Sequence, residues 1–282
     1  MLFLYDLPEW LLGITVVGTV VGLSFASYFA FHRLHRPLFS EDDKMVALTT
    51  LGVVATIHSL LLAFLAVSVW EAFGAAETAV VQEANTIGEL GRDLAVFDTD
   101  EARQARRLLW DYTDKVVKVE WIEMARGSAS REVWNDFDRM FLSIGRLSPD
   151  TPRRVALLPE IWARTNELLK QRRSRLYTTQ SAVPGALWAV VVIGSVLTIA
   201  MAFALMPTRL NLMMLFSLAL SIGLVFFVII AMDRPFAGSE SISPEPYDLA
   251  IENMQRWDTE IAPTSSEDGA SAAHRSTSGS GR

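Results

Sequence analysis

Four long runs of apolar residues dominate the chain, and their lengths predict membrane-spanning helices. Trp10 to Phe31 holds 22 residues without a charged side chain. At about 1.5 Å per helical residue, such a run can cross a hydrocarbon core of about 30 Å. The second run is Met45 to Trp70, in which His58 is the only ionisable side chain. The third and fourth runs are Pro184 to Met206 and Leu212 to Met232. The pattern predicts four transmembrane helices in two hairpins.

A water-exposed helical domain is predicted between the two hairpins. The 113 residues from Glu71 to Val183 carry 18 acidic and 17 basic side chains. One helix is expected over Thr99 to Met124, and a second follows the break at Gly127 to Ser130. That second helix has large apolar residues at intervals of three and four, namely Trp134, Phe137, Phe141 and Ile144.

A further helix is expected to begin at Asp150-Thr151-Pro152, where a capping side chain precedes a proline suited to a first turn. Its apolar-periodic positions are Val155, Leu158, Trp162, Thr165 and Leu169. No long segment alternates apolar and polar residues as a half-buried strand does. We therefore expect an all-α fold.

These boundaries divide the chain into five parts. The expected parts are a first transmembrane hairpin over 1–70 with spans at about 10–31 and 45–70, a helical soluble domain over 71–183, a second hairpin over 184–232 with spans at about 184–206 and 212–232, a tail over 233–262 that packs on the soluble domain, and a disordered tail over 263–282. A short turn, Pro207 to Asn211, joins the last two spans. The disorder is expected because the final residues are mostly small and polar, with little apolar surface to bury.

Composition narrows the possible functions. Hydrophobic residues make up 51% of the chain, charged residues 20%, and the mean hydropathy is +0.27, which is too apolar for an ordinary soluble domain. The absence of cysteine excludes disulfides, thiolate catalysis and Cys-ligated metals. A net charge of -7 argues against nucleic-acid binding, which needs a basic surface. No phosphate loop, nucleophile elbow or zinc-protease motif occurs, so we expect neither an enzyme nor a cofactor.

Four glutamates recur every six residues after the second span: Glu71, Glu77, Glu83 and Glu89. Six residues rotate a helix by about 240°, so these carboxylates point in three directions. They can form a solvated acidic helix, or they can pair with arginines of the soluble domain. In an oligomer with this helix around an axis, Glu71 would instead form a ring of carboxylates that selects ions at the membrane boundary.

Two features of the second span are candidates for function. His58 lies in mid-span, where an ionisable group is costly and is by default a functional candidate. The alternative is a neutral imidazole bonded to a neighbouring helix, with Thr56 and Ser59 as local partners. The same span presents a mostly apolar stripe, which either packs as core or lines a pore as a hydrophobic gate. The stripe comprises Ile57, Leu61, Phe64, Leu65 and Ser68.

Charge gives a small preference for the orientation in the membrane. Five cations near the membrane ends belong to the soluble domain: Arg164, Lys170, Arg172, Arg173 and Arg175. Four lie in the hairpin loops: Arg33, Arg36, Lys44 and Arg209. Five against four favours a cytoplasmic soluble domain and cytoplasmic termini. His32 and His35 lie near three acidic residues, but a mixed-charge loop is a commoner explanation than a metal site, so no metal is expected.

Two stretches resemble a known family. The segment Glu83 to Gly88 (EANTIG), which contains Asn85, resembles the signature of the bacterial bestrophin-like family of four-span membrane proteins. The segment leaving the fourth span is similar to the aspartate-proline-phenylalanine-glycine motif of bestrophins. Its residues here are Asp233, Arg234, Pro235, Phe236 and Gly238. The resemblance covers roughly residues 45 to 257.

The resemblance implies a homo-oligomer of five subunits around an axial pore lined by the second span. Bestrophins of animals and plants conduct anions, and some bacterial relatives pass cations. Calcium gating is not expected, because the acidic cluster of calcium-gated bestrophins is replaced here by Ser239-Glu240-Ser241-Ile242. Independently of this resemblance, the residues themselves allow two roles for Asp233 and Arg234. They either anchor the helix end or tether the segment Leu249 to Trp257 to the soluble domain.

We therefore expect a passive, multi-pass ion channel of a bacterial inner membrane whose partners are lipid and inorganic ions. The acidic residue expected to line the pore indicates selectivity for cations, whereas the resemblance to bestrophins indicates selectivity for anions. The alternative is a membrane-anchored sensor or scaffold, in which the soluble domain binds a ligand or partner and no ion moves.

Overall fold

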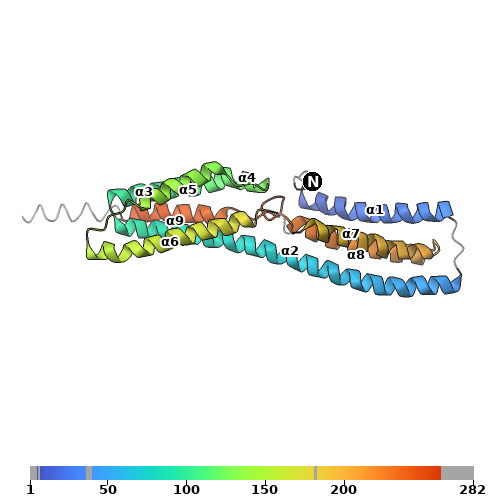
Figure 1. Ribbon diagram of the computed structural model, residues 1–282. Helices are drawn as coiled ribbons and strands as arrows, with labels where there is room; N and C mark the ends of the chain where they lie inside the picture. The colour runs from blue at the N-terminus through green and yellow to red at the C-terminus, as the bar shows by residue number, and fades with distance from the viewer. Residues whose placement is uncertain (1–4, 6, 36–39, 181–182, 262–282) are drawn as a thin grey trace, which may run out of the picture. The chain divides into compact units, whose positions relative to one another are not determined.

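A computed structural model describes residue 5 and residues 7–35, 40–180 and 183–261, and every regular element within these ranges is helical (Figure 1). This confirms the all-α class; the predicted disordered tail over 263–282 lies outside the described residues. In chain order the elements are α1 (Glu9–His35), α2 (Glu41–Phe97), α3 (Asp100–Lys115), the π-helix η2 (Val116–Glu120), α4 (Trp121–Ala125), α5 (Arg131–Ile144), α6 (Pro152–Tyr177), α7 (Gly185–Met201), the 3-10 helix η3 (Ala202–Ala204), α8 (Arg209–Met232) and α9 (Glu245–Ile261).

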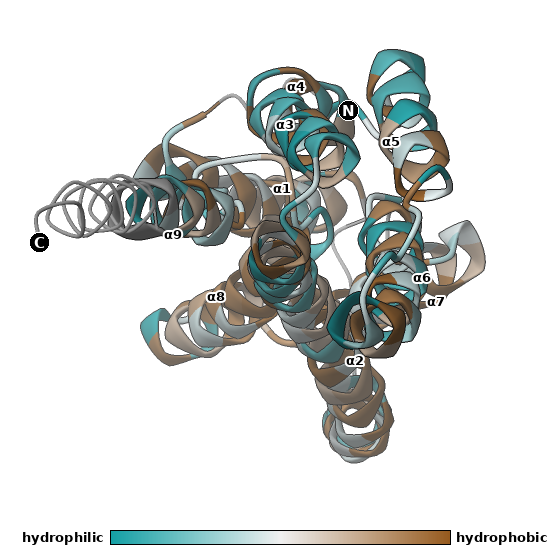
Figure 2. Cartoon of the chain, turned by 90° about the vertical axis from the view of Figure 1, so that its left-hand side faces the viewer, coloured by the Kyte–Doolittle hydropathy of each residue, from teal (hydrophilic) through white to brown (hydrophobic). Residues whose placement is uncertain are grey.

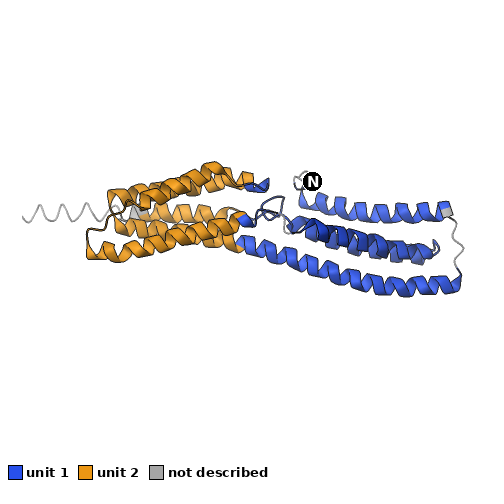
Figure 3. Cartoon of the chain, viewed as in Figure 1, with its two compact units in different colours: residues 1–77, 124–128, 177–242 blue, residues 78–123, 129–176, 243–282 orange. Residues whose placement is uncertain are grey.

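The chain divides into two compact units (Figure 3). The first unit comprises residues 1–77, 124–128 and 177–242, and the second comprises residues 78–123, 129–176 and 243–282. Helix α2 contributes to both. Four helices are long and apolar enough to cross a membrane: α1, α2, α7 with η3, and α8. In Figure 2, α3 and α5 of the second unit carry many hydrophilic residues.

Helix α2 is one continuous helix of 57 residues. Ser40 and Asp43 begin it with a reciprocal cap, in which the Ser40 amide donates to Asp43 Oδ2 at 3.0 Å and the Asp43 amide donates to Ser40 Oγ at 3.1 Å. Its second part, from Thr78 onward, belongs to the second unit. The four glutamates therefore lie on a single helix.

The first unit is held together by close helix contacts. Helices α1 and α8 pack antiparallel, because the Gly13 position meets the Phe227 ring and the Gly223 position meets Val17. A Cβ at Gly223 would lie 3.1 Å from Val17 Cα, so glycine allows the two backbones to approach. At the other end of this pair, the hydroxyl of Tyr28 donates to the carbonyl of Leu205 at 2.6 Å.

Two predicted boundaries differ from the structure. Helix α7 ends at Met201 and η3 replaces its last turn, while α8 begins at Arg209 rather than at Leu212. The reason is a cap: the Thr208 hydroxyl accepts from the amide of Asn211, which brings part of the predicted turn into α8. The helix expected over Thr99–Met124 is also not uniform, because the π-helix η2 interrupts it.

The second unit has an apolar core with a polar centre. Helix α5 buries Val133, Phe137, Met140 and Ile144, whereas Trp134 and Phe141 are only half-buried. Of the positions expected to be apolar-periodic on α6, Thr165 is buried, Leu158, Trp162 and Leu169 are half-buried, and Val155 is exposed. The buried residues of α6 are Ile161, Thr165, Leu168, Gln171, Arg172 and Arg175.

Candidate functional site

The predicted stripe of α2 separates into two faces. Ile57, Leu61, Phe64 and Ser68 are exposed, with Ile57 58% and Phe64 65% accessible, whereas Leu65 is only 6% accessible. Each of the four exposed residues follows the last by three or four positions, and Leu65 is rotated about 100° from Phe64. Leu65 therefore belongs to the packed face of α2.

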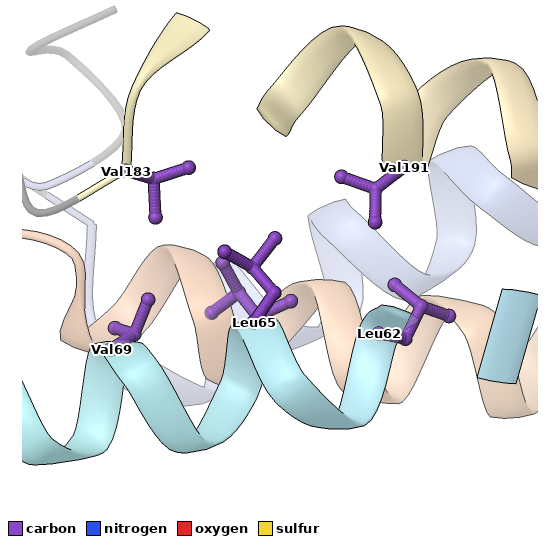
Figure 4. Close-up of a cluster of buried hydrophobic side chains, with 6 residues drawn as sticks. Leu62, Leu65, Val69, Val183 and Val191 are labelled. Atoms are coloured by element: carbon purple, nitrogen blue, oxygen red, sulfur yellow. The ribbon is translucent and has the colours of Figure 1, made fainter. Parts of the chain in front are cut away.

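The packed face of α2 is shown in Figure 4. Leu62, Leu65 and Val69 contact Val183 and Val191, with Ile229 of α8 completing the cluster. His58 precedes these residues at the same spacing and is also buried. The face comprising His58, Leu62, Leu65 and Val69 attaches α2 to α7 and α8, and leaves the face with Ile57, Leu61 and Phe64 uncovered in the single chain.

His58 is bonded to α7. Its Nε2 lies 3.0 Å from Ser195 Oγ, and Ser195 Oγ donates to the Val191 carbonyl at 2.8 Å. Because the serine has only one hydrogen to donate, His58 Nε2 is the donor to Ser195. His58 Nδ1 has no hydrogen-bond partner among the described residues and faces Gly194. The geometry is that of a neutral imidazole bonded to a neighbouring helix.

The four glutamates have three different environments. Glu71 and Glu77 are exposed, and Glu71 directly follows the exposed Trp70. Glu89 pairs with Arg164 of α6. Glu83 is fully buried and pairs with Arg175. The pairing with arginines therefore holds for Glu83 and Glu89, and Glu71 keeps an accessible carboxylate.

A buried ion cluster occupies the centre of the second unit. Arg175 donates through Nε to Glu83 Oε2 at 2.7 Å and through Nη2 to Glu120 Oε2 at 2.7 Å. Arg172 holds Glu120 with two bonds of 2.9 and 2.7 Å. Tyr112 donates to Glu83 Oε1 at 2.6 Å. All four charged side chains are completely inaccessible, so α2, η2 and α6 are joined by two balanced pairs.

Aromatic rings surround the two guanidinium groups. The Arg172 guanidinium lies 4.6 Å from the Trp134 ring and 5.3 Å from the Tyr112 ring, and the Arg175 guanidinium lies 5.8 Å from the Tyr247 ring of α9. Such contacts stabilise a cation that has lost its water. They also bring α3, α5 and α9 into contact with the cluster, so five helices and η2 meet around it.

The cluster shifts the titration of its members. Burial alone would raise the pKa of Glu83, but the charge of Arg175 and the bonds from Arg175 and Tyr112 outweigh it, so this pKa lies below its ordinary value. Burial raises the pKa of Tyr112 and of Tyr247. Since the folded-state pKa of Glu83 is depressed, its stabilising contribution is present above its unfolded pKa, about 4.3, and is lost as the pH falls through the folded value.

The motif after the fourth span forms a fixed turn within the first unit. Asp233 Oδ1 accepts from the amide of Val183 at 3.0 Å, immediately before α7, and the Arg234 guanidinium lies 5.8 Å from the Tyr5 ring. Phe236 is buried. Gly238 has a φ of +98°, a conformation that favours glycine. Asp233 and Arg234 thus make contacts that anchor the end of α8.

Reasoning from sequence missed Tyr112, Glu120, Arg172 and Arg175 as members of a buried cluster. Arg172 and Arg175 were expected to be membrane-edge cations, but both are buried and paired. The spacing of residues in the sequence could have indicated this burial. On α6 the buried positions Ile161, Thr165 and Leu168 continue at the same spacing to Arg172 and Arg175. Charged residues at core positions indicate a paired buried cluster.

The fold resembles that of bestrophin homologues. A crystal structure of a bacterial bestrophin homologue from Klebsiella pneumoniae that carries a mutation is similar with a TM-score of 0.63, at 12% identity, covering 86% of this chain and 97% of that one. A crystal structure of a membrane protein variant gives a TM-score of 0.62 with the same identity and coverage. No protein with a curated description matches the sequence significantly.

The sequence itself matches one protein family. Residues 18–247 match the family described as a bestrophin-like domain, and this range covers more than half of the chain. The range includes both motifs on which the resemblance was based, as well as α2 and the buried ion cluster. The chain therefore belongs to the bestrophin-like family of membrane proteins.

Proposed function

We propose that the protein is a passive ion channel formed by several copies of this chain, with α2 around a central axis. The observation that supports this most is the uncovered face of α2, where Ile57, Leu61, Phe64 and Ser68 remain exposed next to the accessible carboxylate of Glu71. Membership of the bestrophin-like family supports a channel at the family level. By resemblance, the oligomer is a pentamer.

In this proposal the two halves of the uncovered face have different roles. Apolar side chains of several subunits around an axis form a constriction that closes by excluding water. A ring of Glu71 carboxylates at the end of this constriction concentrates cations and repels anions. Leu65 is not part of the proposed gate, because it packs inside the protomer.

Replacing Glu71 with glutamine tests the proposed ring. In planar bilayers with a potassium chloride gradient, the reversal potential of the unmodified protein should lie on the cation side, and Glu71→Gln should move it towards the chloride value. Glu77→Gln is the matched control, because Glu77 is also exposed on α2 but points about 240° away. It should leave the reversal potential unchanged.

Three results would count against parts of the proposal. Absence of ion current under every gradient would argue against a channel. A reversal potential that Glu71→Gln leaves unchanged would exclude Glu71 from ion selection, and an initial potential on the anion side would favour the selectivity of animal and plant bestrophins.

The proposed location is the inner membrane, with the second unit and both termini in the cytoplasm. The distribution of cations does not favour this orientation, because Arg172 and Arg175 are buried. Without them the second unit contributes three membrane-edge cations, against four in the hairpin loops. The proposal therefore rests on the family resemblance.

A single introduced cysteine tests the orientation directly, since the natural chain has none. Ala129 is exposed in the loop before α5, and Ala129→Cys should react with a membrane-impermeant maleimide only after the cells are opened. Ser40→Cys, exposed at the start of α2, should react in intact spheroplasts. The reverse pattern would place the second unit outside and favour the sensor hypothesis.

A further inference from the structure

An open groove runs along α2 and α9 in the second unit. Its volume is about 750 Å³, which is within the usual range for small-molecule sites. On α2 it extends from Val81 to Arg92, roughly 16 Å along the helix axis. Its α9 side extends from Glu245 to Trp257, and Arg106 of α3 also lines it.

The two helices run in the same direction, so the ends of the groove can be assigned. Tyr247 lies beside Arg175, the partner of Glu83, whereas Met254 meets the position of Gly91. Arg106 donates to the Met254 carbonyl at 2.7 Å. The end near Met254 therefore contains Arg92, Arg106 and Arg256, which are three guanidinium groups.

The rest of the groove is lined by apolar and small residues together with two amide side chains, Asn85 and Asn253. Val81 and Leu249 are 40% and 51% exposed there, and the small residues Ala84, Gly88 and Ala250 also line the groove. Two carboxylates also line the groove. Glu89 is engaged by Arg164, and Glu245 lies in the first turn of α9, at the end remote from the arginines.

Gly88 is not required by the packing of the chain itself. A Cβ at Gly91 would lie 2.6 Å from Met254 Sδ, so a small residue there allows α9 to approach. A Cβ at Gly88 would meet no atom within 4 Å. Glycine in a helix costs about 1 kcal/mol relative to alanine, and the small residue at this position leaves room for a molecule in the groove.

We propose that this groove binds a small anionic amphiphile, namely a carboxylate with an unbranched apolar tail. Guanidinium groups match carboxylates in shape and charge, and the apolar part of the groove accepts the tail. The carboxylate would lie at the end with the three arginines, and the tail would lie over Ala84 and Gly88. This inference does not depend on ion conduction.

Photolabelling with a decanoic acid that carries a diazirine in its tail tests the proposal. The full-length protein is reconstituted in phosphatidylcholine nanodiscs, irradiated with the probe, digested and mapped by mass spectrometry. Labels should concentrate in peptides that contain residues 81–92 and 245–257. Excess decanoate should compete, whereas decanol, which has the same tail and no charge, should not.

Two substitutions with matched controls test separately how the groove binds the carboxylate and how it binds the apolar tail. Arg92→Gln should weaken labelling about tenfold, as expected for a lost charge-assisted bond, whereas Arg153→Gln, an exposed arginine outside the groove, should leave it unchanged. Gly88→Leu should fill part of the groove and abolish labelling. Gly74→Leu controls for a leucine on α2, since a Cβ there also meets nothing within 4 Å.

Three results would overturn the proposal. They are labels spread over the whole protein, equal competition by decanol and decanoate, and labelling that appears only after the oligomer is dissociated. The last result would mean that a second copy of the chain covers the groove. Circular dichroism of each variant confirms that a loss of labelling does not come from unfolding.

Discussion

Replacing Arg175 with methionine should destabilise the second unit by about 3–5 kcal/mol, the usual cost of removing one partner from a buried pair. Arg175 is completely inaccessible and bonds to Glu83 and Glu120 together. Without it, Glu83 would keep the Tyr112 bond and the weaker effect of the Arg172 charge, but would lose its ion pair. The pKa of Glu83 would then rise, because the largest charge that opposes the effect of burial, that of Arg175, would be gone.

Thermal unfolding of the detergent-solubilised protein, followed by helical circular dichroism, measures this effect. Arg173→Met is the matched control, since Arg173 is two residues away on α6 and exposed. It should change stability by no more than about 0.5 kcal/mol. Combining Arg175→Met with Glu83→Gln should recover part of the loss, because the unpaired buried charge is removed. Equal melting of Arg175→Met and Arg173→Met would show that the cluster contributes little.

Replacing Gly194 with alanine should destabilise the first unit by about 1–3 kcal/mol, as overpacking of a core does. A Cβ at Gly194 would overlap His58 Nδ1 and would lie 2.9 Å from Cε1 and 3.2 Å from Cγ. The imidazole would have to move, and it would lose its bond to Ser195. The contact between α2 and α7 would weaken at this point.

Gly185→Ala controls for the change of residue type, because Gly185 is on α7 and a Cβ there meets nothing within 4 Å. This control should melt at or slightly above the temperature of the unmodified protein. The double variant Gly194→Ala, His58→Ala should be more stable than the sum of the single changes predicts, since the collision is then absent. If Gly194→Ala melts like Gly185→Ala, the His58 ring is free to move and the assigned contact is wrong.

The membrane helices could be predicted from sequence because each depends on a long local run of apolar residues. The all-α class was predicted because no long segment alternates apolar and polar residues, which is also a local pattern. The ends of α7 and α8 were less predictable, since they depend on single caps such as Thr208. A cap shifts a boundary by a few residues without changing the hydrophobic pattern.

The interior of the second unit was harder to predict because it contains charges. Arginine in a sequence normally indicates a solvent-exposed position, so Arg172 and Arg175 were assigned to the membrane edge. Their partners Glu120 and Glu83 are 52 and 92 residues away along the chain, and no local pattern connects them. On α2, helical spacing grouped Leu65 with the stripe and left core packing and pore lining open; Leu65 lies one helical step from the exposed residues and packs as core with Val191 of α7.

The extra residue of the π-helix η2 determines whether Glu120 points towards Arg172. Glu120 is the last residue of η2, and a π-turn contains one residue more than an α-turn. A relative that lacks this extra residue would turn the position of Glu120 about 100° away from α6 and would leave Arg172 without its carboxylate. In such a relative we expect the gap, the loss of the acidic residue and the replacement of the arginine to occur together.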